Sequence, residues 1–117
     1  MGLLKSPAII NKEDKRMEKE HHELLQEEEA MEASRLLKAI SDPTRIRILH
    51  LLAQEECPVG HIAEVLGMSQ SAVSHQLSYL RSLRLVKYRR DGNTYYYTYE
   101  DEHVIGILQQ VLDHIAH

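Results

Sequence analysis

The chain has 117 residues, 43% of them hydrophobic, and a formal net charge of −4 at pH 7. This length predicts one domain, and since no apolar run is long enough to span a bilayer we expect a cytoplasmic protein with no membrane partner. The single cysteine, Cys57, excludes an internal disulfide framework and the paired thiolates of most redox switches and soft-metal sites.

Charge is unevenly distributed along the chain. The first 32 residues hold nine acidic and five basic side chains, whereas the remaining 85 carry nine of each. We interpret residues 1–30 as a charged arm, helical or partly disordered, and residues 31–117 as the folded domain. Positive charge is concentrated between Ser69 and Tyr97, which favours a local nucleic-acid-binding surface; its basic residues are Arg81, Arg84, Lys87, Arg89 and Arg90.

Apolar residues recur at helical spacing in two segments after the arm. The first segment begins near Met31 and ends near Ser41. In the second, Asp42 suits the N-cap and Pro43 the first turn. The residues predicted to face the core are Ala33, Leu36, Leu37 and Ile40 in the first helix and Ile46, Leu49 and Leu52 in the second.

Two further helices joined by a tight turn are predicted. A short helix starts at Pro58 and ends near Gly67, a residue that tolerates positive φ, and Ser69 can cap the next one. This pattern is typical of a helix-turn-helix, whose second helix presents its N-terminal residues to base edges in the major groove. The residues predicted to read DNA are Gln70, Ser71, Ser74 and His75.

After Leu85 the hydrophobic period changes from that of a helix to that of a strand. Two strands rich in tyrosine and β-branched residues flank Asp91-Gly92, a sequence favoured in hairpin turns. We expect a mainly α fold with a small β-hairpin, a winged helix-turn-helix that binds double-stranded operator DNA. The wing residues predicted to contact phosphates or the minor groove are Arg89, Arg90 and Asn93.

The last segment, residues 102–117, returns to helical spacing with a wide apolar stripe and contains metal-binding residue types. Asp101, His103, His114 and His117 offer one oxygen and three nitrogens, a set that suits Zn(II). His103 and His114 would stand about 16 Å apart on one helix, so one helix cannot close the site. Two antiparallel copies could, provided that Asp101 lies at the N-cap, and we expect a homodimer formed through the first and last helices.

Three stretches of sequence are similar to the ArsR/SmtB family of metal-sensing repressors: DPTRIRIL, SQSAVSHQLSYLRSLRLVKYRRDGNTYYY and DEHV. The resemblance covers the chain from about Ala33 onward. The spacing of Asp101, His103, His114 and His117 resembles the C-terminal-helix site of the zinc-sensing members, the CzrA-type and SmtB-type sensors. The arsenic, cadmium and lead sensors carry two nearby cysteines where this chain has Cys57-Pro58-Val59.

This resemblance implies a mechanism. The metal-free dimer would bind a palindromic operator, and Zn(II), with Co(II) as a second candidate, would release it and so control genes of metal efflux or homeostasis. It also implies an allosteric coupling in which the second ring nitrogen of His114 bonds to backbone near Arg84, at the end of the reading helix.

Other interpretations remain open. The same fold could respond to a non-metal switch such as oxidation of Cys57, or carry a second metal site at His21 and His22, with or without Cys57. A protein-interaction module using the acidic segment 13–32 is another class. A zinc hydrolase is disfavoured because four protein ligands leave no position for an activated water, so we expect neither an enzyme nor a small-molecule substrate.

Overall fold

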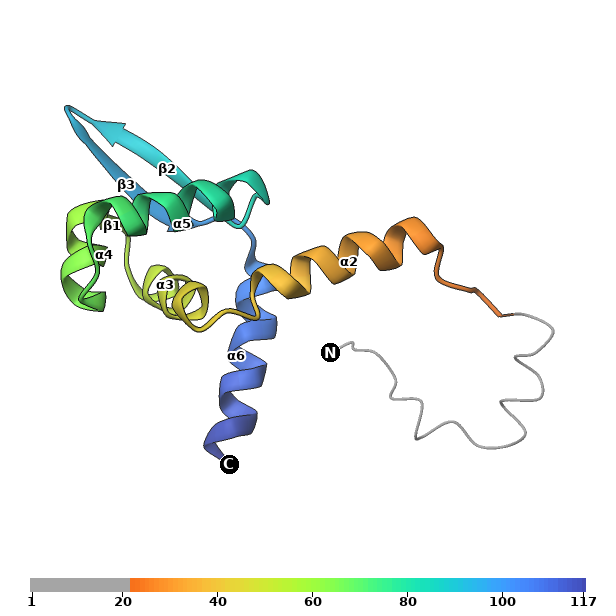
Figure 1. Cartoon of the computed structure of the whole chain (residues 1–117). Coiled ribbons are helices and arrows are strands. Elements are labelled where there is room, and N and C mark those ends of the chain that lie inside the picture. Colours follow the sequence, from red (N-terminus) through yellow and green to blue (C-terminus); the bar gives the residue numbers. More distant parts are fainter. Residues whose placement is uncertain (1–21) are drawn as a thin grey trace. The chain divides into compact units, whose positions relative to one another are not determined.

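The computed structural model describes residues 22–117 (Figure 1). The chain divides into two units, Met1–Glu32 and Ala33–His117, and the second contains the core. The predictions made for residues 1–21, including His21, lie outside the described residues. Among those that are described, no helix is both long and apolar enough to cross a membrane.

The helices and strands follow the order expected of a winged helix-turn-helix, and this fold prediction is confirmed. The helix-turn-helix consists of α4 and α5, and the wing of β2 and β3 (Figure 1). The elements are α2 (Glu27–Ala39), α3 (Pro43–Gln54), β1 (Cys57–Pro58), α4 (Val59–Leu66), α5 (Gln70–Ser82), β2 (Val86–Asp91), β3 (Thr94–Tyr99) and α6 (Glu102–Ala116). Helix α2 begins four residues before the predicted start at Met31.

The expected capping residues set the ends of these helices. The Asp42 carboxylate accepts a hydrogen bond from the backbone N–H of Arg45 at 3.0 Å, and the Ser69 hydroxyl accepts one from that of Ala72 at 3.1 Å. Each bond satisfies an amide that the first helical turn leaves without a partner. Gly67 ends α4 in the left-handed region, at φ 66°, and thereby reverses the chain into α5.

The sheet has one strand more than the sequence predicted. Its order is β1-β3-β2, and the two-residue strand β1 pairs antiparallel with β3, with Cys57 opposite Tyr97. The wing is closed as expected by a two-residue turn between the paired residues Asp91 and Thr94, with Gly92 at φ 63°. Pairing with β1 fixes the base of the wing to the start of α4.

One hydrophobic core lies within the second unit. Its fully buried large side chains are Ile48, Leu49, Ile62, Val73, Leu77, Leu80 and Val86. On α5, Val73, Leu77 and Leu80 are buried, whereas Leu83, the C-cap of this helix, is only half-buried.

Two predicted apolar faces are not covered within one chain. On α2, Ala33 is exposed and Leu37 is 53% exposed, contrary to the expected inner face. On α6, Val104 and Leu108 are buried, whereas Ile107, Val111 and Ile115 are exposed. A helix buries an apolar stripe only where another surface packs against it, and no segment within residues 22–117 covers these side chains.

Candidate nucleic-acid interface and metal centre

The polar face of α5 is exposed along its first half. Gln70, Ser71, Ser74 and His75 are all solvent-exposed, while Val73 and Leu77 on the other side of the helix are buried in the core. The helix begins at the Ser69 cap, and its N-terminal side chains are therefore presented by a rigid element. This arrangement suits insertion into a major groove, although the role of each side chain stays a prediction.

The arginines of the wing are held by specific partners. The Arg89 guanidinium donates two hydrogen bonds to the Glu56 carboxylate, at 2.9 and 2.7 Å, and this pairing lowers the pKa of Glu56. Arg90 donates to the backbone oxygen of Gly92 at 2.8 Å. The sequence did not predict that Arg89 is bound to a carboxylate.

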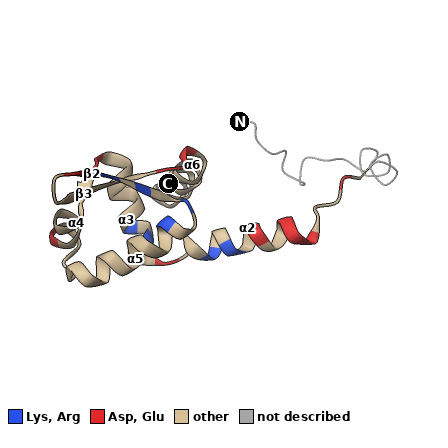
Figure 2. Cartoon of the chain, turned by 90° about the horizontal axis from the view of Figure 1, so that it is seen from above, with Lys and Arg blue, Asp and Glu red and all other residues tan. Residues whose placement is uncertain are grey.

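Each wing arginine also stacks on a tyrosine ring. The guanidinium carbon of Arg89 lies 4.6 Å from the ring centre of Tyr96, and that of Arg90 lies 5.6 Å from Tyr95. Arg81, from the last turn of α5, stacks on Tyr88 of β2 at 4.6 Å. Figure 2 shows the basic residues in blue, including those along β2.

A basic hollow lies where α5 meets the wing. It has a volume of about 500 Å³ and is lined by Arg81, Arg84 and Lys87 together with Val86, Tyr88 and Glu100. Arg84 adopts φ 59°, a left-handed conformation that is unfavourable for a residue with a side chain. Three cations therefore surround this hollow, together with the single carboxylate of Glu100.

The first two predicted metal ligands lie together at the start of α6. Asp101 is the N-cap, as expected: its carboxylate accepts a hydrogen bond from the His103 backbone N–H at 2.7 Å and lies 3.1 Å from His103 Nδ1. The backbone bond is the main cause of the lowered pKa of Asp101. Neighbouring oxygen and nitrogen ligands of a tetrahedral zinc stand about 3.3 Å apart, from bonds of about 2.0 Å. This pair therefore fits half of a zinc site.

The other two predicted ligands lie at the far end of α6. His114 is in the last turn and His117 is the C-cap; both are exposed. One chain therefore does not bring the four residues together, and the spacing along the helix had already implied this separation. Arg84 lines a second hollow, of about 430 Å³, with Asp101 and His103, at the end of α6 opposite His114, so the coupling predicted between Arg84 and His114 is not formed within a single chain.

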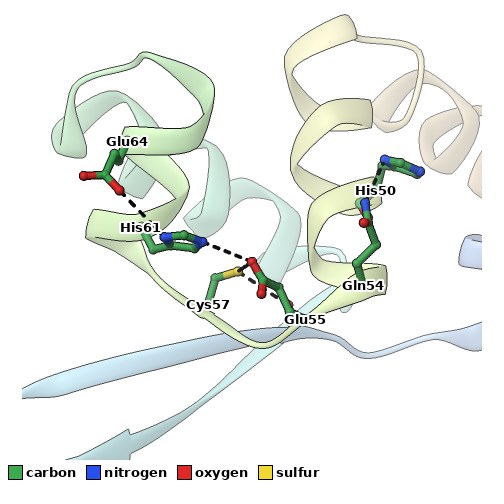
Figure 3. Close-up of polar contacts among 6 residues, drawn as sticks. All are labelled: His50, Gln54, Glu55, Cys57, His61 and Glu64. Atoms are coloured by element: carbon green, nitrogen blue, oxygen red, sulfur yellow. Dashed lines mark hydrogen bonds and ion pairs between the residues drawn. The ribbon is translucent and has the colours of Figure 1, made fainter.

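Cys57 lies in a polar cluster that the sequence interpretation missed. Its side chain is buried, and burial together with the charges of Glu55 and Glu56 raises its thiol pKa to about 11. Figure 3 shows dashed lines that join Glu55 to the Cys57 sulfur and to the His61 ring. The four-residue step from Cys57 to His61 is a possible metal-ligand spacing, but it crosses a strand and a helix start, so no regular period indicated it.

Proteins that are similar to this chain identify its family. The model of the bacterial regulatory protein family arsR matches residues 42–88. The transcriptional repressor SmtB homolog of Synechocystis is 42% identical over 93 residues, covering 80% of this chain and 70% of that protein. The chain belongs to the ArsR family.

Two further relatives of this ArsR-family chain are informative. A cadmium resistance transcriptional regulatory protein, the CadC homolog of Staphylococcus aureus, is 34% identical to this chain. The match covers 77% of this chain and 75% of that protein. The solution structure of a homodimeric winged helix-turn-helix DNA-binding domain from Mycobacterium bovis has 33% identity and a TM-score of 0.70, with 79% of this chain and 88% of that one covered.

Family membership makes this chain a DNA-binding transcription regulator rather than a member of an enzyme family. The segment matched by the ArsR-family model contains α5 with its exposed polar face. It ends before Arg89 and before all four predicted metal ligands. The match thus covers the helix-turn-helix and does not extend to the four predicted metal ligands.

Proposed function

We propose that this ArsR-family protein is a zinc-responsive transcriptional repressor. Its metal-free homodimer binds a palindromic operator and releases it when Zn(II), or Co(II) as a second candidate, binds between the C-terminal helices. The genes so controlled would serve metal efflux or homeostasis. The observation that carries the proposal is the Asp101–His103 pair, arranged at the N-cap of α6 with an oxygen-to-nitrogen distance of 3.1 Å.

Dimerisation would use the apolar surfaces that a single chain leaves exposed. Ile107, Val111 and Ile115 form a stripe on α6 and are 44%, 50% and 72% exposed. A contiguous apolar stripe of this kind is typical of an association surface, and the relative from Mycobacterium bovis is a homodimer. The folded domain, residues 31–117, would thus combine DNA binding with dimerisation, leaving residues 1–30 as an arm.

Two-fold symmetry would complete the metal site. If two copies of α6 pack antiparallel, Asp101 and His103 of one chain face His114 and His117 of the other, giving two equivalent sites per dimer. Three nitrogens and one oxygen form a borderline set that favours zinc over calcium or magnesium. The cadmium-resistance relative supports a metal as the class of inducer.

DNA binding would depend on α5 and the wing. Gln70, Ser71, Ser74 and His75 would contact bases, while Arg90, Asn93 and, once it leaves Glu56, Arg89 would contact the DNA backbone. The hollow formed by Arg81, Arg84 and Lys87 would hold a further phosphate.

Coupling between the two sites would pass through Arg84. This residue lies beside Asp101 and His103, and antiparallel packing would bring His114 of the partner subunit to the same end of the helix. A second hydrogen bond from that histidine to backbone near Arg84 would connect the metal to the end of α5. Linkage then requires that operator DNA weakens zinc binding by the same factor by which zinc weakens operator binding.

An oxidation switch at Cys57 has less support. Reactive thiols are accessible and have a lowered pKa, whereas this thiol is buried and its pKa is raised to about 11. A metal inducer is therefore the better explanation of the same fold.

The test is operator release. Zinc is titrated into the dimer bound to a fluorescent palindromic operator, at a fixed salt concentration, and anisotropy is followed for the wild type and for His103→Ala, His114→Ala and the control His50→Ala, which alters an exposed histidine of α3. We expect zinc to release the wild type and the control but neither ligand variant. Operator binding that is indifferent to zinc in the wild type would reject the metal switch and leave the DNA-binding function standing.

A further inference from the structure

The side chain of Arg45 connects α3 to two other helices, and the function proposed above gives it no role. Arg45 lies in the first turn of α3, where its backbone N–H is bonded to the carboxylate of Asp42. Its Nε donates a hydrogen bond to Gln76 Oε1 of α5 at 3.0 Å, and its Nη1 donates one to the carbonyl of Ala39, at the end of α2, at 3.2 Å. Its guanidinium carbon lies 4.4 Å from the ring centre of Tyr79, also on α5.

We infer that Arg45 is a positioning residue for operator recognition, which holds the reading helix α5 at a fixed orientation relative to α2. It acts through its protein partners and not by contacting DNA. The inference rests on the homodimer and the palindromic operator of the proposed function, because two reading helices fit two half-sites only when each is held at a set distance and angle from the dimer axis. It is independent of the metal that induces release.

Helix α2 is one of the two helices expected to form the dimer interface. Its apolar residue Leu37 is 53% exposed in the single chain, so this side chain is available to a second copy. Its last residue, Ala39, is fully buried in the core. The last carbonyls of a helix lack partners within the helix, and Arg45 donates to the carbonyl of Ala39. Arg45 thereby holds the end of α2 that enters the core.

The partners of Arg45 on α5 directly follow the residues predicted to contact bases. Gln76 is next to His75, and Tyr79 lies one turn further along the same helix. The backbone of α5 packs chiefly against α4 and β2, so the Arg45 side chain adds a constraint from the side of α2 and α3. Because a short helix moves as a rigid element, a shift at Gln76 also displaces the base-reading end of α5.

A guanidinium is suited to fixing the angle between helices. Its planar group donates hydrogen bonds in fixed directions and stacks on aromatic faces, and it loses less freedom per hydrogen bond than the ammonium of a lysine. Both Arg45 and Gln76 are half-buried, so their hydrogen bond is partly shielded from competing water, and the charge of the donor strengthens it. Three contacts in different directions therefore restrain the Arg45 side chain.

Two other roles would use the same side chain. Arg45 could stabilise the fold without affecting recognition, or its remaining N–H groups could bind an operator phosphate. The first role changes stability alone. The second makes the slope of log K against log salt shallower when Arg45 is removed, by about 0.9 for each lost contact and about 1.8 per dimer. A positioning role instead changes how operator affinity depends on the spacing between the two half-sites.

The test compares two DNA duplexes. The metal-free wild type first selects its operator from random duplexes, and a second duplex carries one additional base pair between the half-sites, which moves one of them by about 3.4 Å along the duplex and about 35° around it. Anisotropy titrations at several salt concentrations give the ratio of the two affinities for the wild type, Arg45→Gln, Gln76→Ala and the matched control Arg47→Gln, which alters an exposed arginine of α3. We expect a ratio about fivefold or more lower in Arg45→Gln and Gln76→Ala, the wild-type ratio in the control, and equal salt slopes for the two arginine variants.

Circular dichroism and sedimentation velocity verify that each variant is folded and dimeric, and Gln76→Ala provides the test if Arg45→Gln is not. The wild-type ratio in both variants would overturn the role of Arg45 and leave the proposed function standing. A salt slope shallower by about 1.8 in Arg45→Gln than in Arg47→Gln would assign Arg45 to a phosphate and would also overturn it. A wild type that binds both duplexes equally would reject the palindromic operator itself, and the positioning role with it.

Discussion

Replacing Glu56 by glutamine should release Arg89 for contact with DNA. In the free protein the Arg89 guanidinium is bound to the Glu56 carboxylate by two hydrogen bonds of 2.9 and 2.7 Å. Glutamine keeps the size of the side chain but removes its charge, so the guanidinium no longer has an anion of its own. A phosphate of the operator is then the strongest partner available to it.

The magnitude follows from counterion release. Each new phosphate contact steepens the dependence of log K on log salt by about 0.9. Two wings per dimer give about 1.8, so the ratio of the variant's operator affinity to that of the wild type should fall about 12-fold between about 50 and 200 mM salt. The variant should bind more tightly at the lower salt concentration.

Anisotropy titrations at several salt concentrations measure these slopes. Glu32→Gln, at an exposed residue of α2, removes the same charge without altering the carboxylate that binds Arg89 and should leave the slope unchanged. Combining Glu56→Gln with Arg89→Gln should cancel the gain. If Glu56→Gln and Glu32→Gln give the same slope, Arg89 does not reach a phosphate and the reasoning fails.

Three other predictions concern the thiol, the backbone and the dimer. Because its thiol pKa is raised from 9.0 to about 11, Cys57 should be alkylated by iodoacetamide slowly at neutral pH and about tenfold faster per pH unit up to that pKa; rapid labelling of the folded protein at pH 7 would contradict this. Since the unfolded thiol loses its proton first, the free energy of unfolding should also fall between pH 9 and 11. Arg84→Gly should raise the free energy of unfolding, measured in urea, by about 0.5–1 kcal/mol. This value is the strain energy of the left-handed conformation that glycine removes, minus the cost of the flexibility that glycine adds to the unfolded chain. An equal effect of Arg84→Ala would argue against strain. Val111→Glu should convert the dimer to monomer in sedimentation velocity while Gln110→Glu does not, and a dimeric Val111→Glu would exclude this face of α6 as the interface.

Local sequence patterns predicted the fold well where they coincide with local structure. The Asp42 and Ser69 caps, the Gly67 turn and the Asp91-Gly92 hairpin are all determined within a few residues, and each is found in the structure. The position of Asp101 as the N-cap of α6 was likewise expected, because Asp101 and His103 would lie about 200° apart within a regular helix and could not share a metal there.

Long-range features could not be predicted in this way. Strand β1 has two residues and pairs with Tyr96 and Tyr97, about forty positions along the chain, so it leaves no periodic signal. The bonds between Glu56 and Arg89 span 33 positions and likewise depend on tertiary structure. Leu37 was predicted to face the core but is exposed. The prediction failed because periodicity indicates that a face is apolar without indicating what packs against it.

The stacked arginines of the wing have a consequence for the entropy of DNA binding. A free arginine samples many rotamers and loses that freedom when it binds a phosphate. Arg81, Arg89 and Arg90 are already restricted by the rings of Tyr88, Tyr96 and Tyr95, so much of this ordering occurs when the protein folds. If these arginines bind the operator as proposed, the tyrosines strengthen that binding without touching DNA, through the order they impose on their neighbours.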